Sequence, residues 1–569
     1  MSPRETLHTY FGYDDFRPLQ EDIISRIDSG RDTLALMPTG GGKSLCFQVP
    51  TLMRAERTGQ ALCLVVTPLI ALMKDQVENL RRCDIRAAAI YTGMSLDKQR
   101  TALDNCQFGP YRFLYVSPER LESEAFRKRL SQLPVTLIAV DEAHCISQWG
   151  YDFRPSYLRI AQIRTLLPQV PVLALTATAT PEVVDDIQLR LTAEGQQPDW
   201  QVFRRSFRRD NLSYIVRKTE QKDAQLLHIL TRVPGSGIVY VRNRKRAQDL
   251  AEWLNSRHIQ ADFYHAGLDS AERSRKQEEW KQDRTRIIVC TNAFGMGIDK
   301  PDVRIVIHYD LPDNPEAYFQ EAGRAGRDGL RAYCVLLYAK EDRTNARKRV
   351  TDNYPEREFI EQVYHKTCDY LQVGAGSGLG HTFALHMEDL CRTMHLPVLQ
   401  TYSALHLLAQ AGYIDFNDDE ETSPRLRINV SRNMLDTYEL TPDQRELLYT
   451  LLRSYPGITT DLHYIREEDV RHELLVSLAQ RGIVTYVPRT VACRFTFTQE
   501  RQTDIYLSKL TYEDRRERYT NRLRAMIEYA EQDRYCRQQV LLSWFSEDDS
   551  APCNTCDVCL ARKKATLSP

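Results

Sequence analysis

Short apolar runs alternate with helical patterns through residues 1–345. The runs are continuous and rich in valine and isoleucine: ALCLVVTP, YRFLYVSPE, VTLIAVDEAH, VPVLALTAT, GIVYVR, RIIVCTN and VRIVIHYD. Such runs are typical of strands that are buried on both faces of a parallel sheet. They fall into two blocks, 1–200 and 201–345, which predicts two α/β domains with a cleft between them. Most runs end in polar residues, at the sheet edge where ligands of open α/β folds bind.

The pattern changes after residue 345. MEDLCRTMHLPVLQTYSALHLLAQAGYIDF predicts helix, turn, helix and strand, and QRELLYTLLRS with VRHELLVSLAQRGIVTYVPRTVACRFTF repeats that plan. Both segments resemble winged-helix units, which we expect at 346–436 and 437–510, although such helix pairs often only pack against neighbours. The glycine-rich stretch 373–380 has no strand before it, which favours a linker over a phosphate loop. Residues 511–562 are helical and then rich in cysteine.

Composition narrows the class of protein. The chain has 569 residues, 42% of them hydrophobic and 27% charged, which is typical of a soluble globular protein with several domains. The formal net charge is −1, so a nucleic-acid surface would have to come from local patches. No apolar run has the length of a membrane span, and the N-terminus lacks the build of a signal peptide. We therefore expect a cytoplasmic or nuclear protein.

A candidate nucleotide site follows the apolar run TLALM. The stretch MPTGGGKSLCFQVP (37–50) has the form of a strand, a glycine-rich turn and Lys-Ser opening a helix, which is a phosphate-binding loop. Backbone N–H groups of residues 39–42 (Thr39, Gly40, Gly41, Gly42) would cradle phosphates. Lys43 would reach the β- and γ-phosphates, and the hydroxyl of Ser44 would bind Mg²⁺. Met37 stands where the strict pattern has glycine, and a turn of purely structural use is the alternative.

Two further patterns would complete a phosphoryl-transfer site. LIAVDEAH (137–144) ends a strand in two adjacent acids, of which Asp141 suits Mg²⁺ and Glu142 suits the attacking water. QEAGRAGRDG (320–329) places Arg324 and Arg327 three residues apart, and an arginine supplied across a cleft stabilises charge on the transferring phosphoryl group. Taken singly, the acids could be a solvated turn and the arginines a solvated helix face.

The remaining patterns give the motor region a family resemblance. In order along the chain stand FGYDDFRPLQ (11–20), TPLIALMKDQ (67–76), SPERL (117–121), TATAT (176–180), YVRNR (240–244), YHAGL (264–268) and TNAFGMGIDKPDVR (291–304). Together with the sites above, they resemble superfamily 2 helicases, and specifically the RecQ family of DNA helicases. The resemblance implies two RecA-like motor domains, with nucleotide contacts from Tyr13, Arg17, Gln20, Asp299 and Gln320.

The segment HCISQWGYDFRPSY (144–157), directly after the two acids, resembles the family's aromatic-rich loop. Aromatic faces and arginine bind single-stranded nucleic acid without regard to sequence, whereas a core cluster would seldom be interleaved with Gln, Gly, Asp and Arg. Tyr151 departs from the family pattern, which has a smaller polar ring there. The residues expected to couple DNA to hydrolysis are His144, Trp149, Tyr151, Phe153, Arg154, Thr176 and Thr178.

The resemblance also implies an activity. It is ATP-dependent 3′-to-5′ unwinding of DNA in repair, recombination or replication restart, with ATP, Mg²⁺ and Zn²⁺ as cofactors. The implied partners are single-stranded and tailed duplex DNA, with a single-strand-binding protein as a further candidate and no membrane. In a bacterium the protein would be cytoplasmic and associated with the nucleoid.

Four of the 14 cysteines form a cluster, while the others stand singly and read as core residues. Cys536, Cys553, Cys556 and Cys559 are spaced Cys-x16-Cys-x2-Cys-x2-Cys, which suits a closed tetrahedral zinc site. Disulfides and an iron–sulfur cluster are the alternatives. The preceding text, RLRAMIEYAEQDRYCRQQVLLSWFSE, resembles the RecQ zinc-binding subdomain and so favours zinc.

The order of these parts departs from the family. There the zinc subdomain follows the motor and a winged helix comes after it, whereas here the winged-helix-like material lies between motor and cysteines. Only ten residues follow Cys559, too few for the family's optional C-terminal DNA-binding domain. We expect the segment 341–510 to loop out and the zinc subdomain to return to the second motor domain. No residue of 346–510 is assigned to separating the duplex.

Two other functions compete with a helicase. One is a motor that remodels RNA or protein–DNA complexes without separating strands, and the other is a winged-helix regulator with a vestigial ATPase. The aromatic loop and the cysteine cluster favour the helicase over the first. Intact Lys43, Asp141, Glu142 and Arg327 argue against the second.

Overall fold

The computed structural model describes residues 1–567 except 39, 92–93, 95, 148–149, 151–153, 194, 196, 296–299, 418–420, 423–424, 431–433, 436–437, 456, 460–462, 466–470, 488–489 and 492. The chain forms two compact units. Unit 1 consists of Met1–Ala346 and Asn521–Pro569, and unit 2 consists of Arg347–Thr520. Among the described helices, none is both long and apolar enough to cross a bilayer.

The first sheet of unit 1 is parallel, with the strand order β3-β4-β2-β5-β6-β1-β7. Its strands are β1 (Thr33–Leu36), β2 (Leu62–Val66), β3 (Ala87–Ile90), β4 (Phe113–Val116), β5 (Val135–Val140), β6 (Val172–Thr176) and β7 (Gln201–Arg204). Its helices are α1 (Pro3–Phe11), α2 (Gln20–Asp28), α3 (Leu45–Thr58), α4 (Ile70–Arg82), α5 (Leu96–Phe108), α6 (Glu124–Leu130), α7 (Ile160–Leu166) and α8 (Pro181–Leu191). Strands β1, β2, β4 and β6 are buried along their whole length, as continuous apolar runs require.

The second sheet is also parallel, in the order β10-β11-β9-β12-β13-β8. Its strands are β8 (Leu212–Lys218), β9 (Ser236–Tyr240), β10 (Ala261–Tyr264), β11 (Ile287–Cys290), β12 (Val303–His308) and β13 (Ala332–Tyr338). Its helices are α9 (Lys222–Arg232), α10 (Arg244–Ser256), α11 (Ser270–Lys281), α12 (Pro315–Ala322) and α13 (Lys340–Asn353). Helix α12 begins where Asn314 caps it, its side chain accepting from the N–H of Ala317, and Pro315 occupies the first turn.

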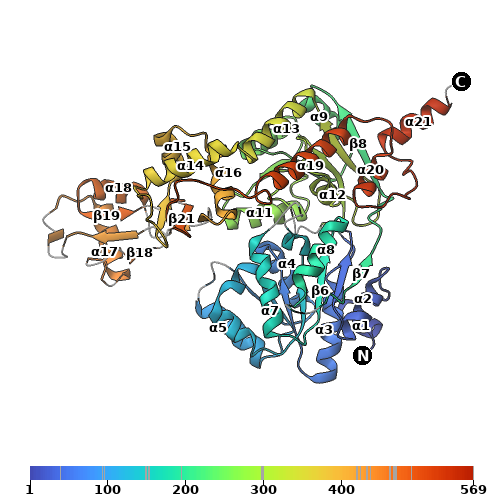
Figure 1. The fold of residues 1–569 in the computed structure, drawn as a ribbon, viewed down its shortest axis with the longest axis horizontal. Coiled ribbons are helices and arrows are strands. Elements are labelled where there is room, and N and C mark those ends of the chain that lie inside the picture. The colour runs from blue at the N-terminus through green and yellow to red at the C-terminus, as the bar shows by residue number, and fades with distance from the viewer. Residues whose placement is uncertain are drawn as a thin grey trace. The chain divides into compact units, whose positions relative to one another are not determined.

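The C-terminal segment returns to the second sheet. It contains α19 (Glu513–Glu531), α20 (Arg537–Trp544) and α21 (Asp557–Leu567), and α19 and α20 lie beside β8 and α12 (Figure 1). The ring of Phe545 packs against Phe207 and Phe319 at centroid distances of 5.1 and 5.2 Å. The N–H of Val216 on β8 donates to Asp557 (3.1 Å). The expected return of this segment to the second motor domain is therefore confirmed.

Unit 2 contains two hydrophobic clusters. Its elements are α14 (Arg357–Tyr370), β14 (Thr382–Leu385), α15 (Met387–Met394), α16 (Val398–Gln410), β15 (Ile414–Asn417), β16 (Glu421–Thr422), β17 (Arg425–Ile428), α17 (Pro442–Ser454), β18 (His463–Tyr464), α18 (His472–Gln480), β19 (Val484–Val487), β20 (Thr490–Val491) and β21 (Cys493–Phe497). Both predicted helix–turn–helix–strand segments are present. Helix α16 carries no lysine or arginine, and most of its residues are buried or half-buried.

The two clusters are nested in the chain. Strand β21 pairs with both β14 and β15, so Phe495 and Phe497 join the core of the first cluster. The second cluster is built from residues 426–484, between β15 and β21. Residues 437–510 were expected to form the second winged-helix-like region, and strand β21 from that range contributes to the core of the first cluster.

The seven apolar runs of the motor region are all strands, and the predicted pair of parallel α/β domains is confirmed. Strands β3, β7, β8, β10 and β13 were not singled out. In β3 the sequence AAAI lacks the branched residues that mark a buried strand, and β7 is partly exposed.

Candidate active site and metal centre

The phosphate-binding loop lies between β1 and α3. The N–H of Gly41 donates to the carbonyl of Pro38 (3.0 Å), and that of Leu45 donates to Gly42 (3.2 Å), which turns the chain tightly into the helix. Gly42 has a φ of 79°, and a Cβ there would lie 2.4 Å from Nε2 of Gln20, so only glycine fits. Lys43 and Ser44 follow at the start of α3, half-buried, and no cap bond engages the Ser44 hydroxyl.

The predicted adenine residues lie beside this loop. Gln20 is buried, and its Nε2 donates to the carbonyl of Gly42 (2.8 Å), while its Oε1 accepts from the N–H of Arg17 (2.8 Å). The guanidinium of Arg17 donates to the carbonyl of Gly40. Tyr13 is 58% exposed, which leaves its ring free to stack on a base. The segment 13–20 and the loop thus form one surface.

The two acids stand at the end of β5. Glu142 has a φ of 48°, and its N–H donates to Oδ1 of Asp141 (3.0 Å). Burial and the adjacent Glu142 raise the pKa of Asp141, and the positive charge of Lys43 opposes that rise. The half-buried Asp141 and the buried Glu142 lie side by side, and this leaves negative charge that a bound cation would offset.

A polar chain connects Glu142 to the end of β6. Oε2 of Glu142 lies 3.4 Å from Nδ1 of His144, and that nitrogen lies 2.9 Å from Oγ1 of Thr176. The same hydroxyl contacts the N–H and carbonyl of Thr178, each at 3.3 Å. All four side chains are buried. A change at Glu142 can therefore reach the TATAT segment through direct contacts.

The two candidate finger arginines occupy different places. Arg324 is 4% exposed and lies near Gly295, because a Cβ on that glycine would be 3.8 Å from its Nη2. The two parallel-sheet domains of unit 1 are called the first and the second lobe. Arg327 of the second lobe reaches the first, because a Cβ on Gly40 would lie 3.3 Å from Cγ of Arg327. Gln320 is buried on α12. Of the two, Arg327 is therefore the one that lies against the phosphate-binding loop.

Two residues that no sequence motif marked hold the turn 323–327, which carries Arg324 and Arg327 and is called the arginine turn. Arg209 donates to the carbonyls of Gly323 (3.1 Å), Ala325 (2.9 Å) and Gly326 (2.6 Å), and Asn211 donates to Gly326 (2.7 Å). A Cβ on Gly326, whose φ is 55°, would lie 2.6 Å from Nδ2 of Asn211. The stretch FRRDN, which contains Arg209 and Asn211, matches no motif. A signal for Arg209 would have been a cation placed to bind the carbonyls that follow the end of a helix.

The aromatic-rich loop is described in part. The N–H of Arg154 donates to the carbonyl of Cys145 (2.9 Å), and the hydroxyl of Tyr157 donates to the carbonyl of Asp141 (3.0 Å). Tyr157 was not predicted, and it ties the loop to the acid pair. The predicted residues that lie outside the described residues are Thr39, Trp149, Tyr151, Phe153 and Asp299.

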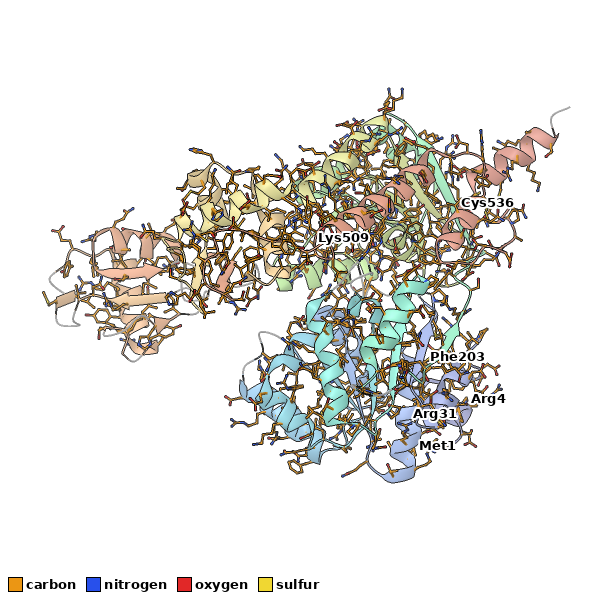
Figure 2. The ribbon with its side chains drawn as sticks, viewed as in Figure 1. Met1, Arg4, Arg31, Phe203, Lys509 and Cys536 are labelled. Atoms are coloured by element: carbon orange, nitrogen blue, oxygen red, sulfur yellow. The ribbon has the colours of Figure 1, made fainter. Side chains whose placement is uncertain are left out.

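The four cysteines come together at the start of α20 and α21; Cys536 is labelled in Figure 2. Their sulfurs all lie within 4.8 Å of one another. Backbone N–H groups of Cys553, Cys556 and Cys559 donate to cluster sulfurs at 3.3–3.4 Å. Hydrogen bonds from Cys536 and Cys556 lower the pKa of Cys553. Converging thiols that accept N–H bonds fit a tetrahedral metal ion without an open position.

A buried arginine secures the cluster to its surroundings. Arg537, fully buried, pairs with Asp557 (3.1 Å) and Asp533 (3.2 Å), and it also donates to the carbonyl of Tyr529. The backbone N–H of Arg537 donates to the sulfur of Cys556 (3.5 Å). Because Asp557 also accepts from β8, the metal centre and the second sheet share one hydrogen-bond network.

Three family models match the chain in order. DEAD/DEAH box helicase matches residues 17–187, helicase conserved C-terminal domain matches 221–329, and RecQ zinc-binding matches 484–560. The last match covers all four cysteines, and a zinc-binding domain that contains a cysteine cluster supports zinc as a cofactor.

Curated relatives match the motor region. The probable ATP-dependent DNA helicase RecS of Bacillus subtilis is 42% identical over 344 residues, which are 60% of this chain and 67% of the relative. ATP-dependent DNA helicase RecQ of Bacillus subtilis is 44% identical over 58% of this chain and 55% of its own length. RecQ of Pasteurella multocida is 40% identical over 59% and 52%. The chain thus spans little more than half the length of these two RecQ proteins.

A solved structure shares the fold. The DUF1998 helicase MrfA bound to DNA superimposes with a TM-score of 0.50 at 17% identity, over 60% of this chain and 51% of that one. At this identity the likeness supports the arrangement of the motor domains and nothing finer.

Replacing Arg327 with alanine should lower the kcat of ATP hydrolysis by roughly 10²–10³-fold with a much smaller change in KM, because charge on the transferring phosphoryl group loses its partner. Steady-state ATPase measurements test this. The exposed Arg331, four residues further on, provides the matched control Arg331→Ala. Equal activity of the two variants would contradict the role of Arg327.

Elemental analysis of the purified chain should give one zinc and no iron per molecule. Cys556→Ala should lose the metal and lower the melting temperature by roughly 5–10 °C, because structural zinc contributes folding free energy directly. Cys83→Ala, at a cysteine outside the cluster, should keep it. Iron with acid-labile sulfide, or full zinc retention in Cys556→Ala, would refute the assignment.

Proposed function

This chain belongs to the RecQ family of ATP-dependent DNA helicases, and on that premise we propose that it uses ATP hydrolysis to unwind DNA in the 3′-to-5′ direction. The observation that carries the proposal is the meeting of two lobes at one loop. Lys43 and the acid pair come from the first lobe, and Arg327 of the second lies against Gly40. Hydrolysis then requires both lobes, so it can drive their relative motion.

Within this site each residue has a proposed role. Tyr13, Arg17 and Gln20 bind adenine, and the N–H groups of residues 40–42 with Lys43 bind the phosphates. Asp141 and Ser44 would hold Mg²⁺, since carboxylate and hydroxyl oxygens are the ligands it prefers and Asp141 stands directly beside a second carboxylate, Glu142. Bound Mg²⁺ would neutralise phosphate charge during transfer. Glu142 orients the attacking water and accepts its proton.

Single-stranded DNA is the proposed ligand of the segment 144–157. The segment contains Trp149, Tyr151, Phe153 and an arginine suited to base stacking, and its described part contacts the catalytic acids through Tyr157 and His144. Binding of DNA there can consequently alter the positions of Asp141 and Glu142. Thr176 and Thr178 extend this connection to the TATAT segment.

Polarity and cellular setting rest on the family. The 3′-to-5′ direction, tailed duplex substrates, a role in repair, recombination or replication restart, and association with the nucleoid and a single-strand-binding protein are carried over from it. The winged-helix-like region has no assigned contact with DNA. The lack of lysine and arginine on α16 favours a bracing role for that helix over groove reading.

Strand-separation assays on 3′-tailed, 5′-tailed and blunt duplexes test the proposal. We expect ATP-dependent unwinding of the 3′-tailed duplex, and a loss of roughly 10²-fold or more in Lys43→Ala, because that lysine stabilises phosphate charge. Lys98→Ala, at an exposed lysine of the first lobe, is the matched control.

The rival functions give different results in the same assay. Hydrolysis stimulated by nucleic acid but without separation of any duplex would favour a remodelling motor. DNA binding with no hydrolysis would favour a winged-helix regulator. Preference for the 5′ tail would reverse the proposed polarity alone.

A further inference from the structure

Arg522 on α19 contacts two parts of the motor that are far apart in sequence. Its Nη1 donates to the carbonyl of Gly150 in the aromatic-rich loop (3.3 Å), 372 residues away. Its Nε lies 3.2 Å from Oε1 of Glu316 on α12. The Arg522 side chain is 17% exposed and that of Glu316 is 4% exposed. One guanidinium thus joins the first lobe to the second through the C-terminal segment.

Glu316 is suited to anchor one side of this bridge. It lies in the first turn of α12, where a carboxylate interacts favourably with the helix dipole. Since it is buried, its charge needs a partner, and the only ion pair that it forms within the described part of the chain is with Arg522. Breaking the pair would leave the buried charge of Glu316 without a partner. The contact of Arg522 with Glu316 is therefore stronger than its contact with Gly150.

The other contacts of α12 fix it to the same segment. Tyr318 packs against Tyr529 at a centroid distance of 5.3 Å, and Phe319 packs against Phe545 at 5.2 Å. Helix α12 leads directly into the turn that carries Arg324 and Arg327. Arg522, α12 and the finger turn therefore move together, held by aromatic packing and a buried ion pair.

The contact with Gly150 is different in kind. Within the described residues, the contact with the loop is a hydrogen bond of 3.3 Å to a neutral carbonyl, near the long end of the usual range, whereas Glu316 is a charged and buried partner. If the loop changes position, we expect the bond to Gly150 to break more readily than the ion pair with Glu316.

We propose that Arg522 is a positioning residue that couples the aromatic-rich loop to α12. Through this coupling, the position of the loop determines how closely Arg327 approaches the phosphate-binding loop. DNA is the ligand whose binding would change the loop, and in this respect the inference rests on the proposed function. Arg522 touches neither nucleotide nor DNA in this role. Arg522 affects the factor by which bound DNA increases the rate of ATP hydrolysis.

The test compares ATP hydrolysis with and without saturating single-stranded oligonucleotide in Arg522→Gln. The ratio of the two rates should fall by about tenfold, because coupling contacts typically change such ratios by that order. The rate without DNA and the Kd for the oligonucleotide should change by less than about twofold, and zinc content should stay at one. Arg524→Gln, at an exposed arginine two residues along the same helix, is the matched control.

Two further variants separate coupling from bracing. Arg522→Lys keeps the charge opposite Glu316 but cannot bridge Glu316 and Gly150 with one planar group, so the brace should persist while the ratio stays lowered as in Arg522→Gln. Glu316→Gln should lower the ratio as Arg522→Gln does, and the double variant should be no worse than either single one, because both remove the same interaction.

The outcomes divide cleanly. A ratio in Arg522→Gln equal to that of Arg524→Gln, or a parallel fall of both rates, overturns the inference, since the second result is what a brace alone would give. Should Arg522→Gln lose zinc, Glu316→Gln decides by the same criterion. If the parent chain shows no stimulation by DNA, it is the proposed function that fails.

Discussion

The packing of α12 against the C-terminal segment is the interaction on which the working of this motor depends. Helix α12 delivers Gln320 and the arginine turn to the nucleotide cleft, yet it has only eight residues and would not be stable alone. Its aromatic face is covered by Tyr529 and Phe545, its buried acid is paired with Arg522, and the turn that follows it is held by hydrogen bonds from Arg209. The cysteine cluster adjoins this packing, because Arg537 connects Cys556 to Asp557 and to the carbonyl of Tyr529.

The nucleotide cleft adds an electrostatic constraint to this mechanical one. Burial and the neighbouring Glu142 raise the pKa of Asp141 and so disfavour its charge, and the positive charge of Lys43 opposes that rise. The arginine turn supplies positive charge from the second lobe. Arg327 fits against the phosphate-binding loop because Gly40 of that loop has no side chain. A site divided in this way is complete only when the lobes meet, so hydrolysis can report on, and drive, their closure.

Sequence patterns predicted the parallel sheets and the cysteine cluster, because continuous apolar runs and closely spaced ligands are local signals. The return of the cluster to the second lobe was expected from the resemblance of this segment to the RecQ zinc-binding subdomain. The patterns did not reveal the alanine-rich strand β3 or the nesting of the two clusters in unit 2, which depends on β21 pairing across an insertion. Arg209, Arg537 and Arg522 were missed for a similar reason. An arginine among many looks like solvated surface until the fold brings its partner close, and the partner of Arg522 on the aromatic loop is 372 residues away.

The central claim is that the C-terminal segment holds α12 in place, and hydrogen exchange of the α12 amides tests it most directly. In Phe545→Ala the amides of residues 318–322 should exchange at least about tenfold faster than in the parent chain, because removing a buried aromatic typically costs about 3–5 kcal/mol of packing, while helix α3 should be unchanged. Tyr535→Ala, at a ring that is 66% exposed, should leave both helices as they are. Unchanged protection of α12 in Phe545→Ala would contradict the account.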